Sequence, residues 1–244
     1  MREAGLILSG IMVEIASLIT PGVKTLGLEE RFMFLCGKYG VFPACKGYTA
    51  EGYLPPFPTG LCVSVNNQSV HCYPTKDRTL VTGDIITVDT VIKYKGLHAD
   101  CAFAKAVGRI SQRNQQLLDA SKSALLHCEK LVKPGVKIGF IAHNMEELVK
   151  AGGFNVLRDY AGHGIGTQMH EYPEIPCYAD SSEGPVLKTG MTICVESLVC
   201  EGNPKVDVVD DWATQMHDGK NFAQFEHTIL VTADGYEVLT PFEV

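Results

Sequence analysis

The stretch ITVDTVIKYKGLHADCAFAK, residues 86–105, predicts two β-strands joined by a tight turn. Its first part is rich in β-branched residues, its last part is apolar at alternate positions, and the KYKG between them has the composition of a turn. If Tyr94 and Lys95 form the tip, Asp89 lies directly opposite Asp100, with β-carbons about 5 Å apart. Two carboxylates at that distance repel in a half-buried sheet, unless one is protonated or a cation lies between them. The hairpin therefore raises the hypothesis of a metal site.

The two aspartates of the hairpin do not by themselves require a metal ion. Aspartates eleven residues apart occur by chance in many chains. In addition, Gly96 can host a β-bulge, which would shift the register by one residue and separate the pair. The remaining motifs of the sequence have to decide whether a metal site is present.

Composition and charge limit the class of protein. The 244 residues fit one large domain or two fused halves, and 45% hydrophobic with 20% charged residues is typical of a soluble globular protein. The net charge is −7 and basic residues form no long run, which disfavours nucleic-acid binding and a polybasic membrane patch. The N-terminal segment has the pattern of an amphipathic helix without a cleavage site, and no apolar run reaches the roughly 18 residues of a membrane span. A cytoplasmic protein is expected.

The nine cysteines are scattered and form no C-x-x-C motif. This spacing argues against a structural zinc site and against a disulfide framework, so most cysteines are expected to be reduced thiols that pack as small apolar groups.

A short internal repeat suggests two related halves. Pro21-Gly22-Val23-Lys24 matches Pro134-Gly135-Val136-Lys137, and each copy lies between two expected helices. We therefore expect a single catalytic domain over residues 1–244, with pseudo-repeat halves of about 1–108 and 109–244.

The expected elements indicate an α+β fold, with helices on one side of a curved antiparallel sheet. Besides the hairpin they are helices over 2–18, 26–38, 111–132 and 138–151, and strands over 61–66, 154–160, 191–199, 224–231 and 236–239. The segment 47–60 is rich in Pro, Gly and aromatic residues and is expected to be a long, functional loop.

Three further acidic or imidazole side chains stand in unusual settings. His163 is framed by glycines in GHGIG, which leaves its ring unobstructed, although a tight bend with a satisfied histidine gives the same pattern. Glu196 and Glu226 each interrupt an apolar strand, where a carboxylate is costly unless it has a partner or faces water at a sheet edge. With the two aspartates they make an oxygen-rich set carrying four negative charges, which two divalent ions neutralise better than one. Mn(II), Fe(II), Co(II) or Zn(II) suits such ligands.

In this order the motifs resemble those of the type I methionine aminopeptidases, which have the pita-bread fold. The likeness rests on His71, D-T-V at Asp89, H-A-D at Asp100, GHGIG at His163, M-H-E-Y-P at His170, G-M-T-I-C-V-E at Glu196 and F-A-Q-F-E-H-T at Glu226. It runs nearly from end to end of the chain. The resemblance implies a fold of two pseudo-symmetric halves, with the helices on the outer face of the sheet.

The resemblance also implies roles for these residues. Asp89 with both oxygens would hold one metal ion, His163 and Glu196 the other, and Asp100 and Glu226 would bridge the two. Glu196 would carry a proton for the attacking water. His170 would polarise the peptide carbonyl, and His71 would contact the substrate nitrogen.

The same resemblance places the methionine pocket of the substrate. Its walls would be Tyr48, Phe57, Cys62, Met169 and Trp212, with Cys45 nearby, although Trp212 as the only tryptophan can equally be a core residue.

Departures from the family pattern affect the pocket more than the metal site. They are Ser197 in place of proline, Cys72 in place of glycine, Met169 in place of an aromatic residue, Asp211 in place of glycine, and a longer loop from Tyr48 to Phe57. Of these, Cys72 is expected to crowd the substrate path.

Nascent peptides with a small second residue are the substrates implied, with contact at the ribosome left open, and a monomer is expected. No cysteine- and histidine-rich extension precedes the domain and no long insertion precedes Glu196, as expected for type I. Two alternatives remain: an aminopeptidase or prolidase of the same fold that cleaves X-Pro bonds, and a catalytically inactive protein that binds peptides in the cleft.

Overall fold

The computed structural model describes residues 1–49 and 55–242, and its helices agree closely with the sequence pattern. They are α1 (Arg2–Leu18), α2 (Thr25–Tyr39), α3 (Gln112–Glu129) and α4 (Ile138–Ala151). Ser111 caps α3, because its side-chain oxygen accepts a hydrogen bond from the backbone N–H of Asn114. None of the helices within the described residues is long and apolar enough to cross a membrane.

Twelve strands are present in the described part of the chain. They are β1 (Phe42–Pro43), β2 (Cys62–Val65), β3 (Ile85–Tyr94), β4 (Leu97–Ala106), β5 (Asn155–Val156), β6 (Ala161–Gly164), β7 (Glu171–Pro176), β8 (Thr192–Cys200), β9 (Val206–Val208), β10 (Thr214–Met216), β11 (Phe222–Val231) and β12 (Tyr236–Val238). Seven of them follow the order β1-β3-β4-β11-β8-β6-β7 in one sheet, and every pairing in that sheet is antiparallel. The expected α+β fold is therefore confirmed.

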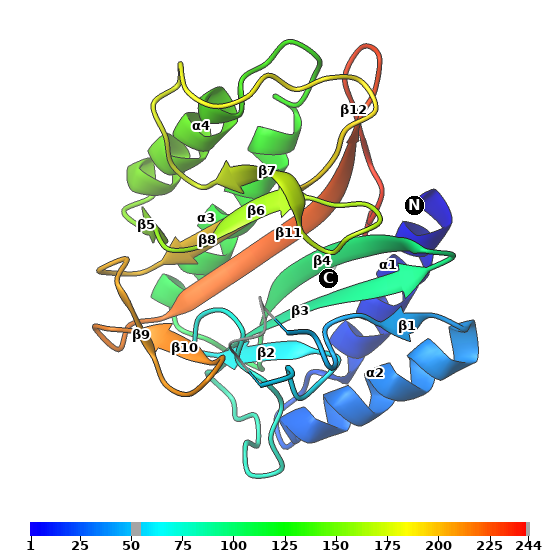
Figure 1. Cartoon of the computed structure of the whole chain (residues 1–244). Helices are drawn as coiled ribbons and strands as arrows, with labels where there is room; N and C mark the ends of the chain where they lie inside the picture. The colour runs from blue at the N-terminus through cyan, green and yellow to red at the C-terminus, as the bar shows by residue number, and fades with distance from the viewer. Residues whose placement is uncertain (50–54, 243–244) are drawn as a thin grey trace.

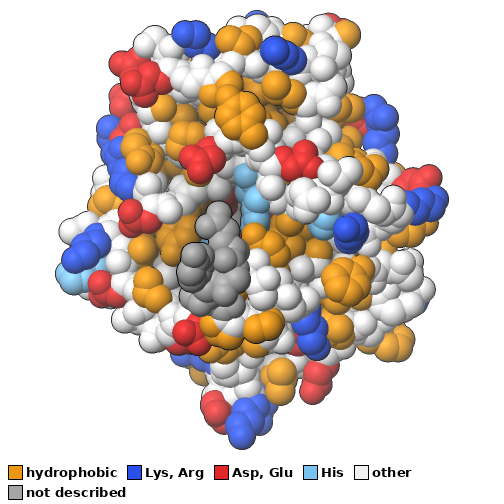
Figure 2. All heavy atoms as spheres, in the orientation of Figure 1, with side chains coloured by type: hydrophobic (Ala, Val, Ile, Leu, Met, Phe, Trp, Pro, Cys, Tyr) orange, Lys and Arg blue, Asp and Glu red, His pale blue; other side chains and the backbone are white. Residues whose placement is uncertain are grey.

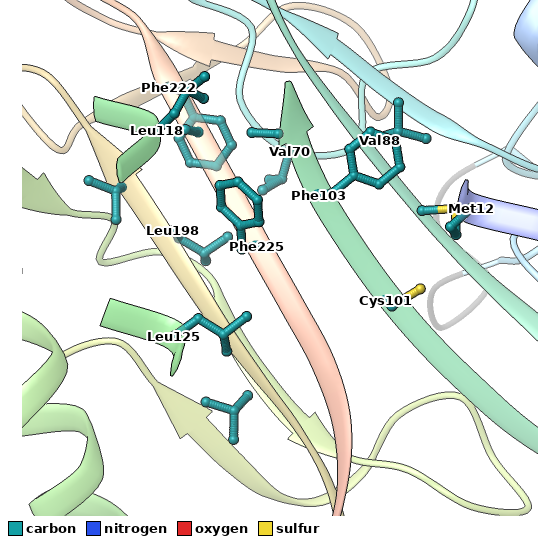
Figure 3. Close-up of a cluster of buried hydrophobic side chains, with 14 of the residues drawn as sticks. Met12, Val70, Val88, Cys101, Phe103, Leu118, Leu125, Leu198, Phe222 and Phe225 are labelled. Atoms are coloured by element: carbon teal, nitrogen blue, oxygen red, sulfur yellow. The ribbon is translucent and has the colours of Figure 1, made fainter. Parts of the chain in front are cut away.

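The helices cover the sheet in two pairs, as Figure 1 shows. Helix α1 packs on β3 and β4, whereas α3 packs on β8 and β11, the two strands beyond β4. In Figure 3, Met12 of α1 lies on the side of Val88 and Phe103, and Leu118 of α3 lies on the side of Phe225. The apolar core thus fills the space between the helices and one face of the sheet, which leaves the other face for a site.

The β3–β4 hairpin forms as predicted, but its register differs from the prediction. Its turn is Lys95-Gly96, so Asp89 lies opposite Ala102 and Asp100 lies opposite Val91. The expected direct pairing of Asp89 with Asp100 is wrong. Both turn residues have positive φ, 49° and 83°, as a two-residue hairpin turn of the I′ type requires, and glycine suits its second position.

The shift of two residues keeps both aspartates on one face of the sheet, because side chains alternate with a period of two. Val88 and Phe103 are cross-strand neighbours within the helix-side core. Asp89 and Asp100, at the alternate positions, line a cavity on the opposite face.

The two Pro-Gly turns of the sequence repeat make the same set of contacts. The N–H groups of Gly22 and Gly135 donate to the carbonyls of Leu80 and Leu187, at 2.8 and 2.9 Å. The N–H groups of these leucines donate back to the carbonyls of Val23 and Val136, both at 2.8 Å. Both glycines have positive φ, 93° and 88°, which glycine adopts without steric cost. The two helix–turn–helix units are therefore built alike.

One expected strand is wrong over most of its length, and the strands β1, β6, β7, β9 and β10 were not expected. Of the expected strand 154–160, only Asn155–Val156 is extended, because the chain then turns outward to exposed Arg158, which pairs with Glu146 on α4. Of the strands that were not expected, β7 contains two prolines and lies at the end of the sheet, where prolines are tolerated.

Candidate metal centre and active site

Three carboxylates lie in one row across four neighbouring strands. Asp89 on β3 is opposite Ala102 on β4, Ala102 is opposite Glu226 on β11, and Glu226 is opposite Glu196 on β8. The small side chain of Ala102 leaves space in the middle of the row. Glu196 and Glu226 are directly opposed, so their β-carbons are about 5 Å apart and their like charges repel.

Asp100 and His163 complete the group from either side of this row. Asp100 is two residues from Ala102 and therefore shares its face, and its backbone is held by Thr228, whose hydroxyl contacts both the N–H and the carbonyl of Asp100 at 3.0 and 2.8 Å. His163 is on β6, and its Nε2 lies 3.6 Å from Oδ2 of Asp100. Ligand atoms of Asp100, His163, Glu226 and Cys194 all lie within 4.8 Å of one another.

The buried carboxylates lack the partners that a metal-independent site would supply. Among the described residues, Oδ1 of Asp100 and Oε1 of Glu226 are buried without a hydrogen-bond partner. Burial raises the pKa of Asp89 to about 7 and that of Glu196 to about 8. It also raises the pKa values of Asp100 and Glu226 well above the ordinary range. For Glu196, Asp100 and Glu226, neighbouring carboxylates add to the effect of burial on the pKa. Orphaned buried oxygens and four adjacent carboxylates fit a site that binds cations.

Sequence reasoning missed two neighbours of the carboxylates. Gln224 donates from Nε2 to Oε2 of Glu196 at 2.9 Å and to Oε2 of Glu226 at 3.3 Å. Cys194 lies beside Asp100 and Glu226, but burial raises the pKa of its thiol well above the ordinary value, so it remains a protonated apolar group. Both were readable, because each is two residues from a glutamate on the same strand face.

Two further histidines face the same cavity. The rings of His163 and His170 are 4.4 Å apart, and the hydroxyl of Tyr48 lies 3.0 Å from Nδ1 of His170. The pKa of His170 is lowered by burial and by the nearby His98. Burial, with His170 nearby, lowers the pKa of His71 to about 4, and burial lowers that of His163 to about 4 as well. These imidazoles are therefore neutral near pH 7, so each ring can donate one hydrogen bond from one nitrogen and accept one at the other.

His71 is held in an unusual backbone conformation. Its φ is 59°, in the left-handed region, and its ring stands edge-on to the rings of Tyr160 and Trp212. Such a conformation costs about 1–3 kcal/mol and persists only where the surroundings enforce it. The fold thus directs this imidazole into the cavity.

The predicted pocket residues form one apolar group beside the carboxylates. Cys45, Phe57, Cys62 and Met169 belong to a single buried cluster, with Tyr48 and Trp212 packed against it. Trp212 stands edge-on to Phe57 and donates from its indole N–H to the carbonyl of Pro55. Cys62 is the cross-strand neighbour of Asp89, so this cluster lies next to the carboxylate row.

All the predicted site residues line one cavity of about 990 Å³. They are Tyr48, Phe57, Cys62, His71, Asp89, Asp100, His163, Met169, His170, Glu196, Trp212 and Glu226. Figure 2 shows histidine side chains in the hollow at the centre of this face, with hydrophobic and acidic side chains around it. The arrangement can hold cations next to an apolar pocket and neutral imidazoles.

The contacts of Cys72 and Ser197 account for two departures from the family pattern. The thiol of Cys72 is buried and donates to the carbonyl of Thr214, and Cys72 is absent from the cavity lining, so the expected crowding of the substrate path is wrong. Ser197 replaces proline within β8, and its hydroxyl lies 2.8 Å from that of Ser121 on α3. In the loop from Tyr48 to Phe57, residues 50–54 lie outside the described residues.

Comparisons with known proteins agree with this geometry. The model of metallopeptidase family M24 matches residues 1–233. The chain is 38% identical over 241 residues to methionine aminopeptidase 1 of Bacillus subtilis, which covers 98% of this chain and 94% of that protein.

Solved structures give the same picture. The structure of the methionine aminopeptidase of Thermotoga maritima superposes with a TM-score of 0.94 and 39% identity, covering 100% of this chain and 95% of that one. The prolidase of Pyrococcus furiosus matches with a TM-score of 0.75 and 19% identity, covering 100% of this chain and 63% of that one. The second likeness extends to the fold alone.

Proposed function

The chain belongs to metallopeptidase family M24, and on this premise we propose that it removes the N-terminal methionine from polypeptides with a small second residue. The carrying observation is the apolar pocket of Cys62, Met169 and Trp212 directly beside the carboxylate row, in a chain that is similar over its full length to methionine aminopeptidases. An aminopeptidase needs such a pocket for the first side chain within reach of the hydrolytic centre. A nascent polypeptide is the substrate that this reaction implies.

Two divalent ions, drawn from Mn(II), Fe(II), Co(II) and Zn(II), are proposed for the carboxylate group. Asp89, Asp100, His163, Glu196 and Glu226 would together hold these ions. The four negative charges and the unpartnered oxygens of Asp100 and Glu226 support this assignment. When bound, the ions would act as Lewis acids that make a water molecule acidic near neutral pH.

The side chains around the carboxylates supply the remaining steps. Glu196, a buried carboxylate that accepts a hydrogen bond from Gln224, would take up the proton of the attacking water and return it. The hydroxyl of Tyr48 lies 3.0 Å from Nδ1 of the neutral His170; with this hydroxyl as the donor, the ring would carry its proton on Nε2, and this N–H would donate to the carbonyl oxygen of the first peptide bond. His71, also neutral near pH 7, would contact the substrate nitrogen and assist the departing amine.

A substitution of Trp212 tests whether this residue forms a wall of the proposed methionine pocket. Replacing Trp212 with alanine is expected to lower kcat/KM for a Met-Ala-Ser peptide by about 10- to 100-fold, mainly through KM, because burying a methionine side chain is worth about 1.5–3 kcal/mol. Phe34→Ala is the control, since Phe34 is exposed on α2. Steady-state kinetics with Mn(II) measures both. Unchanged kinetics of Trp212→Ala would show that Trp212 is only a packing residue.

Substrate preference separates the proposal from the X-Pro alternative. With Mn(II) or Co(II) added, Met-Ala-Ser is expected to be cleaved and an Ala-Pro peptide is expected to remain intact. Chromatography that monitors the released first amino acid over time gives the cleavage rates of both peptides. Exclusive cleavage of Ala-Pro would overturn the methionine assignment, and failure of the purified protein to bind either ion in calorimetry would favour the peptide-binding alternative.

The wider organisation is proposed on the same basis. The whole chain would act as one catalytic domain in the cytoplasm, as a monomer, with halves of about 1–108 and 109–244. The matched contacts of Gly22 and Gly135 support the two halves, and the sheet that runs from β1 to β7 supports a single domain. Contact with the ribosome would bring the enzyme to its nascent substrates.

A further inference from the structure

Gln224 occupies a central place among the carboxylates, and its role follows from its contacts. It lies on β11 two residues before Glu226, so its side chain shares the face of Glu226, and it is 2% exposed. Its Nε2 lies 2.9 Å from Oε2 of Glu196 and 3.3 Å from Oε2 of Glu226. Metal-bound glutamates would be ionised and could only accept hydrogen bonds, so the group that faces them is the NH₂ of the amide. One amide therefore joins two opposed glutamates on neighbouring strands.

The cavity wall offers these carboxylates no free lysine or arginine: within the described residues it contains no lysine, and its one arginine, Arg158, is paired with Glu146. A neutral donor is thus the group that the fold places among these negative charges.

The contacts of Gln224 leave a carboxylate oxygen of Glu226 available to bind a cation. In both glutamates the amide contacts Oε2, whereas Oε1 of Glu226 remains buried and without a partner among the described residues. An amide that fixes one oxygen of a carboxylate orients the other oxygen for an incoming cation, as groups behind metal ligands commonly do.

We propose that Gln224 is a positioning residue that holds Glu196 and Glu226 side by side with their free oxygens turned toward the metal ions. The inference rests on the proposed function, because it takes the carboxylates to be metal ligands. Gln224 itself does not contact the substrate in this role.

The test is a replacement that keeps the size of the side chain and removes the donor. Gln224→Met is expected to weaken Mn(II) binding by about 10- to 100-fold in calorimetry, the usual effect of losing a group that orients a ligand. The visible absorption bands of the Co(II)-loaded protein are expected to shift as well, because the ligand geometry changes. Gln115→Met is the matched control, since Gln115 is exposed on α3 and bonds Asp119.

The outcomes separate the role of Gln224 from the proposed function. If the parent protein binds neither Mn(II) nor Co(II), the proposed function fails. If the parent binds and Gln224→Met binds within about twofold of it with unchanged Co(II) bands, only the role of Gln224 is overturned. Gln224→Leu provides a second donor-free side chain should the methionine variant not fold, which circular dichroism would reveal.

Discussion

Replacing Asp100 with alanine is expected to lower the rate of Met-Ala-Ser cleavage by about 10³-fold or more while leaving the metal-free protein at least as stable as the parent. The loss follows because Asp100, whose ligand atom lies within 4.8 Å of those of His163 and Glu226, would be a ligand at the centre of the group that holds the ions. Lewis-acid stabilisation of the transition state is worth several kcal/mol, and about 4 kcal/mol corresponds to a factor of about 10³.

The expected stability has a separate physical cause. The Asp100 carboxyl is buried, its Oδ1 has no partner among the described residues, and its pKa is raised by burial and by Asp89. Removing an uncompensated buried carboxyl relieves a cost of folding. The space left opens into the cavity of about 990 Å³, so no sealed void forms, and the Thr228 hydroxyl still holds the backbone of residue 100.

Two measurements check the Asp100 prediction. Steady-state kinetics with excess Mn(II) gives the loss of activity, and calorimetric melting with a chelator gives the stability of the metal-free form. Asp119→Ala, at an exposed position of α3, is expected to match the parent in both. An active Asp100→Ala enzyme would contradict the two-ion mechanism. An inactive variant that melts far below the parent would instead assign Asp100 a structural role.

The hairpin shows how far local sequence determines this site. The alternation of residues predicts which side chains share a face. The predicted turn was off by one residue, and this displaced the cross-strand pairing by two residues. The prediction of the shared face is still correct. The turn lies one residue later than predicted because positive φ at both tip positions favours a glycine in second place, and Gly96 takes that place. A displacement by two preserves the face, so the prediction of a shared site for Asp89 and Asp100 did not depend on the register.

Contacts between distant strands were not predictable in the same way. The row from Asp89 through Ala102 to Glu226 and Glu196 requires the strand order β3-β4-β11-β8, which no local pattern specifies. The order of the motifs along the chain identified these carboxylates through the family resemblance. Their proximity in space comes from the strand order of the sheet. The place of Gln224 on the face of Glu226 could be read from its spacing, whereas its contact with Glu196 on another strand could not.

The metal-free protein is expected to lose stability as the pH rises from 6.5 to 8, and bound Mn(II) is expected to remove this loss. The pKa of Asp89 is raised from 3.8 to about 7 and that of Glu196 from 4.5 to about 8, mainly by burial. In this interval the folded protein therefore holds protons that the unfolded chain has released. Each such proton makes the free energy of unfolding fall by about 1.4 kcal/mol per pH unit.

Histidines oppose this trend most strongly at lower pH. The pKa values of His71 and His163 are lowered from 6.5 to about 4, so folding excludes their protons and stability falls as the pH drops below 6.5. From pH 6.5 to 8 the unfolded chain releases the remaining half proton of each of these histidines, which raises the free energy of unfolding by only about 0.4 kcal/mol per histidine, less than the loss from the two carboxylates. The buried thiols of Cys36 and Cys128 have pKa values raised from 9.0 to about 12, which affects stability mainly above pH 8 and equally with or without metal.

Urea unfolding at pH 6.5, 7.25 and 8, with Mn(II) or with a chelator, measures the difference directly. Bound ions require ionised ligands, so the stabilisation by Mn(II) should grow across the interval. Glu196→Gln should flatten the slope of the metal-free protein by about one proton, whereas Glu147→Gln, at an exposed position of α4, should not change it. A metal-free protein whose stability is constant or increases from pH 6.5 to 8 would show that these carboxylates are already ionised in the fold, and their charges would then have to be balanced without metal.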